Sequence, residues 1–338
     1  MAEIQLETSD FQRQDQRRLQ QENTLASADA DDLLTRPTFN VWKLQKEEMV
    51  DLLARMFRQL DFFEHLRMEE ETLHNFLESV QSRYRENPFH NFRHAFCVTQ
   101  MMYSLIQLCH LQEALSIEDI AVLMVASLCH DVDHPGLSNT YQVNAHTELA
   151  VRYENKSPLE NHHCSVTLHI LSQLQSNIFC NTSPHTSRYI QEGITELILA
   201  TDMTHHSTIL QALQQIQNLD FSDRDHMTWV KKSLLKFCDI SNEVRPAEQA
   251  EIWADALMEE YFQQSDLEKT EGLPVTPYMD RETVTKAISQ KTFIQFLLLP
   301  LCKALCEIFP ELKAWTMEPL REAMLRYEKQ TGQQTESA

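Results

Sequence analysis

Residues 120–131 read IAVLMVASLCHD, an almost uninterrupted apolar run that ends in two ionisable side chains, His130 and Asp131. Ser116 and Asp119 stand just before the run, where a hydroxyl and a carboxylate three residues apart can form a capping box. A Pro-Gly pair a few residues beyond the run would stop a helix. We therefore predict a buried helix that carries His130 and Asp131 in its last turn.

The ionisable pair at the end of this run needs compensation, because a buried charge is costly unless a metal ion or a partner group stabilises it. His130 and Asp131 are therefore candidate metal ligands. For the pair taken alone, a hydrogen-bonded histidine beside a surface aspartate is an equal alternative.

Two further histidines lie upstream of this helix. Asn87-Pro88 resembles an N-cap followed by proline at the first helical position, which predicts a helix over the following residues. His90 and His94 are four residues apart and would share one face of that helix. Apolar residues continue along the same face, so two ordinary core histidines are the alternative.

A carboxylate ends another apolar pattern far down the chain. Apolar residues recur at helical spacing from Met227 to Cys238, and Asp239 follows them. Taken singly, Asp239 could be an ordinary helix-end residue. Two histidines and two aspartates from separate helices suit a divalent ion of zinc type, and the hard aspartate oxygens leave room for a magnesium-like ion that shares Asp131.

The composition predicts an all-α protein. Only 4 glycines occur in 338 residues, and strand-like alternation is hard to find. Because the candidate ligands extend from position 94 to position 239 and must meet in one place, we expect a single large compact multi-helix domain over residues 37–328. Residues 1–36 are expected to be a polar extension, mobile or separately helical, and residues 329–338 a polar tail.

The charge and cysteine content limit the partners. With 29 basic and 50 acidic residues and a net charge of −21, the surface should repel nucleic acid and anionic membranes. The apolar run interrupted by Pro300 is too short for membrane insertion. Eight cysteines without CxxC spacing indicate core thiols in a reducing compartment, and without a secretory signal we expect a cytoplasmic protein.

Several of these motifs, in one order, resemble the catalytic domain of the mammalian-type 3',5'-cyclic-nucleotide phosphodiesterases, and most closely their high-affinity, cGMP-specific type nine class. The resemblance covers about residues 37 to 328. The motifs are HNFRH at 90–94, HDVDHPG at 130–136, SPLENHH at 157–163, LATDM at 199–203, DISNEVRP at 239–246 and EGLPV at 271–275.

The resemblance implies a role for individual residues. The first metal, usually zinc, would be held by His94, His130, Asp131 and Asp239. Asp131 would also bridge to a second ion, magnesium or manganese, and His90 would be the general acid. The implied substrate-binding positions are Gln290, Phe293, Tyr261, Ser289, Ile240, Leu257 and Met203. The implied polar residues around the metals are His134, Glu160, His163, Thr201, Asn242 and Glu243.

Some of these residues have competing structural interpretations. Ser157 and Glu160 also fit a capping box with proline at the first helical position. His134 and His163 could simply cover helices, and Glu243 could be a surface charge beside Arg245. Asp202 and His206 are four residues apart, a pattern that we interpret as a solvated helix face rather than another metal site.

The resemblance implies hydrolysis of cGMP to 5'-GMP, with the cyclic nucleotide as the small-molecule partner. One alternative is an HD-type phosphohydrolase that acts on cAMP or on another phosphoester. Another is a non-catalytic nucleotide-binding protein with a structural metal, for which a proton donor at His90 would have no use. An amide such as Gln290 can present a donor or an acceptor to a purine, so residues alone do not separate cGMP from cAMP. Because relatives are often dimers, a homodimer is an alternative to a monomer.

Overall fold

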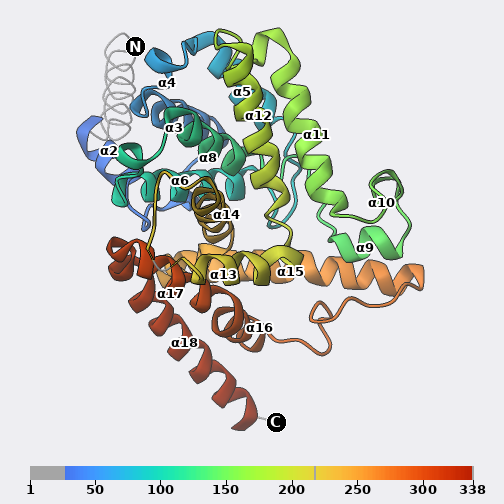
Figure 1. Ribbon diagram of the computed structural model, residues 1–338. Coiled ribbons are helices and arrows are strands. Elements are labelled where there is room, and N and C mark those ends of the chain that lie inside the picture. Colours follow the sequence, from blue (N-terminus) through green and yellow to red (C-terminus); the bar gives the residue numbers. More distant parts are fainter. Residues whose placement is uncertain (1–26, 217, 337–338) are drawn as a thin grey trace, which may run out of the picture.

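The structure, a computed structural model, describes residues 27–216 and 218–336, and this part of the chain contains helices and loops but no strand (Figure 1). The prediction of an all-α chain is therefore confirmed. No helix among the described residues has both the length and the apolar character needed to cross a membrane.

The helices of the N-terminal half surround the chain's most apolar segment. In chain order they are α2 (Ser27–Leu34), η1 (Val41–Lys43), α3 (Lys46–Gln59), α4 (Phe62–His65), α5 (Glu70–Gln81), α6 (Phe92–Leu108), α7 (Leu111–Ala114), α8 (Ile117–Cys129), α9 (Asn139–Asn144), α10 (Glu148–Arg152) and α11 (Pro158–Ser172).

The second half contains the longest helices. They are η2 (Leu174–Ser176), α12 (Pro184–Leu199), η3 (Met203–His205), α13 (His206–Gln214), α14 (Arg224–Ile240), η4 (Ser241–Val244), α15 (Ala247–Glu271), α16 (Lys286–Phe293), the π-helical turn η5 (Ile294–Leu298), α17 (Leu299–Ile308), η6 (Pro310–Leu312) and α18 (Lys313–Glu336).

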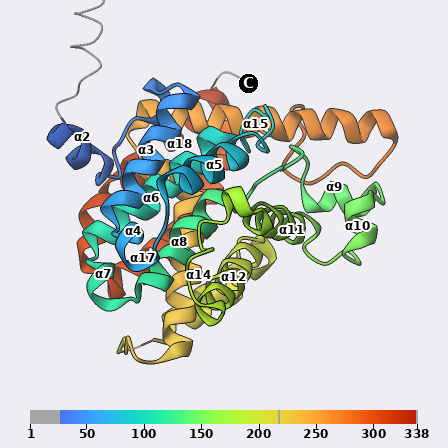
Figure 2. The same ribbon diagram turned by 90° about the horizontal axis from the view of Figure 1, so that it is seen from above.

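Helix α8 forms the centre of the core, as its sequence predicts. Every residue from Ile120 to Cys129 is buried, and α6, α12 and α14 pack around the helix (Figure 2). Ser116 caps its N-terminus by accepting the backbone N–H of Asp119 at 3.1 Å. The chain leaves the helix at His130, directly after Cys129. A buried helix therefore ends in ionisable groups that the core must accommodate.

Helix α15 is the longest helix of the described residues. It runs between the N-terminal helices on one side and the group of α16, α17 and α18 on the other (Figure 1). Its polar residues Glu260, Gln264 and Glu268 are spaced four residues apart, and each is 3 % exposed or less. One face of α15 is therefore polar and buried.

Helices are present outside the expected limits of the domain, residues 37 and 328. Leu34 of α2 is fully buried, and Gln100 of α6 donates to the carbonyl oxygens of Leu34 and Arg36 at 2.9 Å each. At the other end α18 continues to Glu336, through most of the expected polar tail. Residues 1–26 of the expected extension lie outside the described residues.

The contact between α12 and α8 depends on Gly193. A Cβ at this position would lie 2.9 Å from Cγ2 of Val122, a side chain with little rotamer freedom. Overpacking a core costs about 1–3 kcal/mol, whereas alanine's helix propensity returns only about 1 kcal/mol. We expect Gly193→Ala to lower the free energy of unfolding by about 1 kcal/mol.

Thermal or urea denaturation measures this change. The neighbouring exposed Glu192 on the same helix provides the control, since Glu192→Ala should leave stability nearly unchanged. A Gly193→Ala variant as stable as the unmodified protein would show that α12 and α8 are not packed this closely.

Candidate active site

Four predicted metal ligands converge at one buried point. His94 lies in the first turn of α6, His130 and Asp131 follow α8, and Asp239 lies at the end of α14. Their ligand atoms all lie within 4.8 Å of one another. Both histidines are fully buried. The sequence therefore located the four residues, and the fold brings them together.

The spacing of these atoms fits ligands that share one ion. His94 Nε2 lies 3.2 Å from His130 Nε2 and 3.2 Å from Asp239 Oδ1, and 3.5 Å from Asp131 Oδ2. His130 Nε2 lies 3.0 Å from Asp131 Oδ2 and 3.2 Å from Asp239 Oδ1. Neighbouring ligand atoms bound at 2.0–2.1 Å to one zinc-type ion lie roughly 3 Å apart. The donor set and its dimensions therefore suit a divalent metal.

The protonation of His130 supports the same conclusion. Its Nδ1 donates to the carbonyl oxygen of Ser127 at 2.8 Å, so Nε2 is the nitrogen that faces the cluster. Burial disfavours its charged form, but Asp131 and Asp239 raise the pKa of His130 well above its ordinary value. The two carboxylates thus favour a positive charge at this point, which a bound metal ion can supply.

His90 lies beside the cluster but not on the predicted helix. The N-cap of α6 is Asn91, whose side chain accepts the backbone N–H groups of Arg93 and His94, so the helix predicted from Asn87-Pro88 is wrong. Residues 87–91 form a loop instead, because Asn87 donates to the carbonyl oxygens of His90 and His134 at 2.8 Å each. His90 therefore approaches the site from a loop.

Glu260 of α15 holds that loop and the His90 ring. Its Oε2 accepts the backbone N–H groups of Phe89 and His90, each at 3.0 Å, and its Oε1 contacts Nδ1 of His90. Burial opposes the charge on His90, but the adjacent Glu260 raises the pKa of His90 to about 9. The ring therefore holds a proton near neutral pH while Nδ1 is fixed by the carboxylate.

Glu260 was not predicted from the sequence. An isolated glutamate in an acidic helix is usually interpreted as a surface residue, and only its burial reveals its function. The repeat of Glu260, Gln264 and Glu268 at four-residue spacing is the one signal that could have indicated a buried polar face.

His134 and His163 lie around Asp131 and are uncharged. Burial lowers the pKa of His134 well below its usual range and that of His163 to about 4. His163 donates through Nδ1 to the carbonyl oxygen of Val132 at 2.8 Å, so its Nε2 faces Asp131 Oδ1, 3.7 Å away, as an acceptor. A water molecule or cation between these two acceptors would satisfy both.

Glu160 lies in the same cleft, although not as a capping residue. Ser157 has a left-handed backbone conformation and makes no cap, since its hydroxyl donates to Asp202 at 2.7 Å. Glu160 instead accepts from Nδ2 of Asn139 at 2.8 Å. Burial raises the pKa of Glu160 to about 7. The capping box predicted for Ser157 and Glu160 is therefore wrong, and Glu160 lines the cleft instead.

Asp202 also belongs to the cleft. It is 6 % exposed, and its Oδ1 accepts the backbone N–H of Thr204 at 2.8 Å. His206 is 4 % exposed. The interpretation of these two residues as a solvated helix face is therefore wrong, because the turn at η3 directs both side chains inward.

Several of these groups line a cleft of about 300 Å³. Of the residues expected to bind substrate, Tyr261 and Met203 line it, together with Thr201. The ionisable residues of the lining are His90, Asp131, His134, Glu160, Asp202, Asp239 and Glu260.

Other predicted site residues lie outside this lining. Gln290 is buried on α16, Ser289 and Phe293 are partly buried on that helix, and Ile240 and Leu257 pack against the core. Asn242 lies 4.0 Å from the sulfur of Cys97. Glu243 is directed to α18, where it accepts from Tyr327 at 2.9 Å and Arg326 at 3.0 Å. The structure therefore does not bring Glu243 to the metal cluster.

Comparison with known proteins identifies relatives of this chain. Residues 89–320 match the family model described as 3'5'-cyclic nucleotide phosphodiesterase. The chain is 50 % identical over 306 residues to the high affinity cGMP-specific 3',5'-cyclic phosphodiesterase 9A of Homo sapiens, covering 90 % of this chain and 52 % of that protein. It is 38 % identical over 277 residues to the cGMP-specific 3',5'-cGMP phosphodiesterase 3 of Dictyostelium discoideum, covering 81 % and 59 %. The chain thus spans about half the length of these curated relatives.

Solved structures share the fold. The phosphodiesterase domain of the RhoPDE fusion protein from the choanoflagellate Salpingoeca rosetta superimposes with a TM-score of 0.85 at 27 % identity, covering 93 % of this chain and 99 % of that one. LmjPDEB1 in complex with IBMX gives a TM-score of 0.84 at 27 % identity, covering 88 % and 93 %. The resemblance indicated by the sequence motifs is confirmed.

The raised pKa of His90 predicts the effect of changing Glu260. His90 should be protonated below pH about 9 and lose its proton above it. In Glu260→Gln the carboxylate charge is lost while burial still disfavours the imidazolium, so the pKa of His90 should fall by at least about one unit.

An NMR titration of the His90 ring protons in the chelator-treated protein measures this shift. Glu259, the exposed neighbour on the same helix, provides the matched control, and Glu259→Gln should leave the titration unchanged. Equal pKa values for His90 in the Glu260→Gln variant and the unmodified protein would contradict the assigned pairing.

Proposed function

The chain belongs to the 3',5'-cyclic nucleotide phosphodiesterase family, and we propose that it hydrolyses 3',5'-cyclic GMP to 5'-GMP. The observation that carries this proposal is one cleft lined by the proton-bearing His90 and by Asp131 and Asp239, the two carboxylates of the cluster that His94 and His130 complete. The guanine nucleotide as substrate follows from the names of the human and Dictyostelium relatives.

The metal requirement belongs to the same proposal. His94, His130, Asp131 and Asp239 would hold zinc, and Asp131 would share a second, more hydrated ion, magnesium or manganese. When bound, such a pair supplies Lewis-acid charge that activates water and attracts the phosphate of the substrate. The neutral His134 and His163 and the carboxylate of Glu160 would hydrogen-bond water around the second ion.

His90 is proposed as the general acid. Opening the cyclic phosphodiester leaves a 3'-oxygen that must gain a proton. Glu260 keeps His90 protonated at neutral pH and fixes its Nδ1, so Nε2 is the nitrogen that can donate. Because Nδ1 is occupied by Glu260, His90 can serve the cleft without acting as a ligand in the His94 cluster. A purely structural metal site would have no use for this arrangement.

The nucleotide base is proposed to contact the residues implied by the resemblance. Tyr261 and Met203 line the cleft. Gln290 and Phe293 on α16, with Ser289, Ile240 and Leu257, remain predicted base-binding residues, and the amide of Gln290 would hydrogen-bond the purine. Assembly as a homodimer and a cytoplasmic location are further parts of this proposal.

Replacement of His90 separates acid catalysis from metal binding. We expect His90→Ala to keep the metal content of the unmodified protein while turnover of cGMP falls by about 10²–10⁴-fold, the usual contribution of a positioned acid. Metal analysis and steady-state kinetics on one preparation measure both quantities. Loss of the metal together with normal turnover of the remaining loaded fraction would contradict the role of His90.

The substrate assignment is tested with both cyclic nucleotides. The metal-reconstituted protein should hydrolyse cGMP with a higher kcat/KM than cAMP. The chelator-treated protein should bind cGMP poorly, because the net charge of −21 gives the anionic phosphate no other long-range attraction. Equal rates or a preference for cAMP would overturn the proposed specificity, and hydrolysis of neither nucleotide would overturn the proposed activity.

A further inference from the structure

Lys236 is a buried lysine close to the metal cluster. It lies on α14, three residues before Asp239, and is 1 % exposed. Two neighbouring lysines on the same helix form ion pairs, Lys231 with Asp119 and Lys232 with Glu196 at 2.8 Å. Lys236 instead directs its ammonium group to backbone carbonyl groups, which is an unusual use of a buried charge.

The ammonium group of Lys236 binds three consecutive residues. Nζ donates to the carbonyl oxygen of Thr201 at 2.9 Å and to that of Asp202 at 3.2 Å, and it lies 3.6 Å from the sulfur of Met203. An ammonium group has three N–H donors, so these contacts can engage all of them. The segment Thr201–Met203 is therefore attached directly to the helix that carries Asp239.

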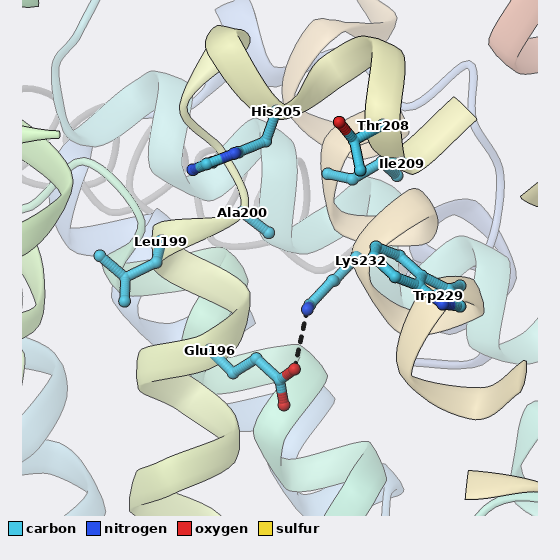
Figure 3. A pocket seen from close by; sticks show the side chains of 8 residues that line it. All are labelled: Glu196, Leu199, Ala200, His205, Thr208, Ile209, Trp229 and Lys232. Atoms are coloured by element: carbon cyan, nitrogen blue, oxygen red, sulfur yellow. Dashed lines mark ion pairs between the residues drawn. The ribbon is translucent and has the colours of Figure 1, made fainter. Parts of the chain in front are cut away.

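This segment forms one wall of the cleft. Thr201, Asp202 and Met203 all line it, together with Asp131 and Asp239. The adjacent residues Ala200 and His205 line a different cavity of about 250 Å³, which is shown in Figure 3 with its Lys232–Glu196 ion pair. The segment therefore lines the cleft between residues that line the other cavity, and the lysine that holds it can set its position.

Lys236 lies in an acidic environment. Burial lowers its pKa, whereas the neighbouring Asp239, Asp202 and Glu160 act in the opposite direction. A structural alternative is that Lys236 only satisfies carbonyl groups just beyond the C-terminus of α12, where cations are favoured. That alternative predicts an effect on stability but none on nucleotide binding.

We propose that Lys236 is a positioning residue that fixes Thr201–Met203 in the wall of the cleft that Asp131 and Asp239 also line, and thereby sets the affinity of the cleft for the nucleotide phosphate. This inference rests on the proposed function. It concerns a residue that does not line the cleft itself and acts through the three residues that it holds.

The test compares three variants. Lys236→Met removes the donors at similar length, Lys236→Gln keeps a donor but loses the charge, and Lys232→Met removes a lysine one turn away that serves the other cavity. For each protein, kcat and KM for cGMP, bound metal, melting temperature and the affinity for 5'-GMP by calorimetry are measured.

We expect Lys236→Met to raise KM and weaken 5'-GMP binding by about tenfold, which corresponds to ~1.4 kcal/mol, with kcat changed far less and the metal content unchanged. Lys236→Gln should lie between this variant and the unmodified protein, and Lys232→Met should match the unmodified protein in both nucleotide measurements.

A folded, metal-loaded Lys236→Met variant with unchanged KM and 5'-GMP affinity would overturn the proposal, even if its melting temperature fell. If Lys236→Met does not fold, Lys236→Gln decides by the same criterion, and failure of both variants to fold assigns a purely structural role. An unmodified protein that hydrolyses no cyclic nucleotide would overturn the proposed function instead, and the positioning role would then be judged on 5'-GMP binding alone.

Discussion

The buried charge at the end of α8 is the constraint on which the rest of the structure depends. An apolar helix in the centre of the core ends in His130 and Asp131, and the fold places His94 and Asp239 within 3.2 Å of the His130 ring nitrogen. Two carboxylates and two imidazoles at one buried point are stable only if a positive charge joins them. The start of α6 and the ends of α8 and α14 are consequently fixed relative to one another.

Burial and neighbouring charge give the histidines of the cleft different protonation states. His90 and His134 stack with ring centroids 4.1 Å apart, yet Glu260 raises the pKa of His90 while burial lowers that of His134. Environments that separate the pKa values of adjacent groups are the usual way in which one site contains both an acid and a neutral hydrogen-bonding partner. Helix α15 supplies this asymmetry through a single carboxylate.

The sequence predicted the elements that depend on local patterns and missed those that depend on tertiary contacts. The helix Ile117–Cys129 with its cap Ser116 and the four candidate metal ligands were evident, since apolar periodicity and a side-chain cap are local signals. Asn87 and Ser157 carried the same local signals, but tertiary hydrogen bonds to His134 and Asp202 use their side chains instead. Glu260 gave only the weak signal of its four-residue repeat with Gln264 and Glu268, because its role exists only where α15 meets the loop before α6.

X-ray absorption at the edge of the tightly bound metal in the purified protein tests the central claim most directly. The account predicts one such ion per chain, with only nitrogen and oxygen ligands at about 2.0–2.1 Å. A sulfur ligand at about 2.3 Å, which the nearby Cys97 or Cys238 would have to supply, would contradict it. So would a folded protein that binds no metal in stoichiometric amount.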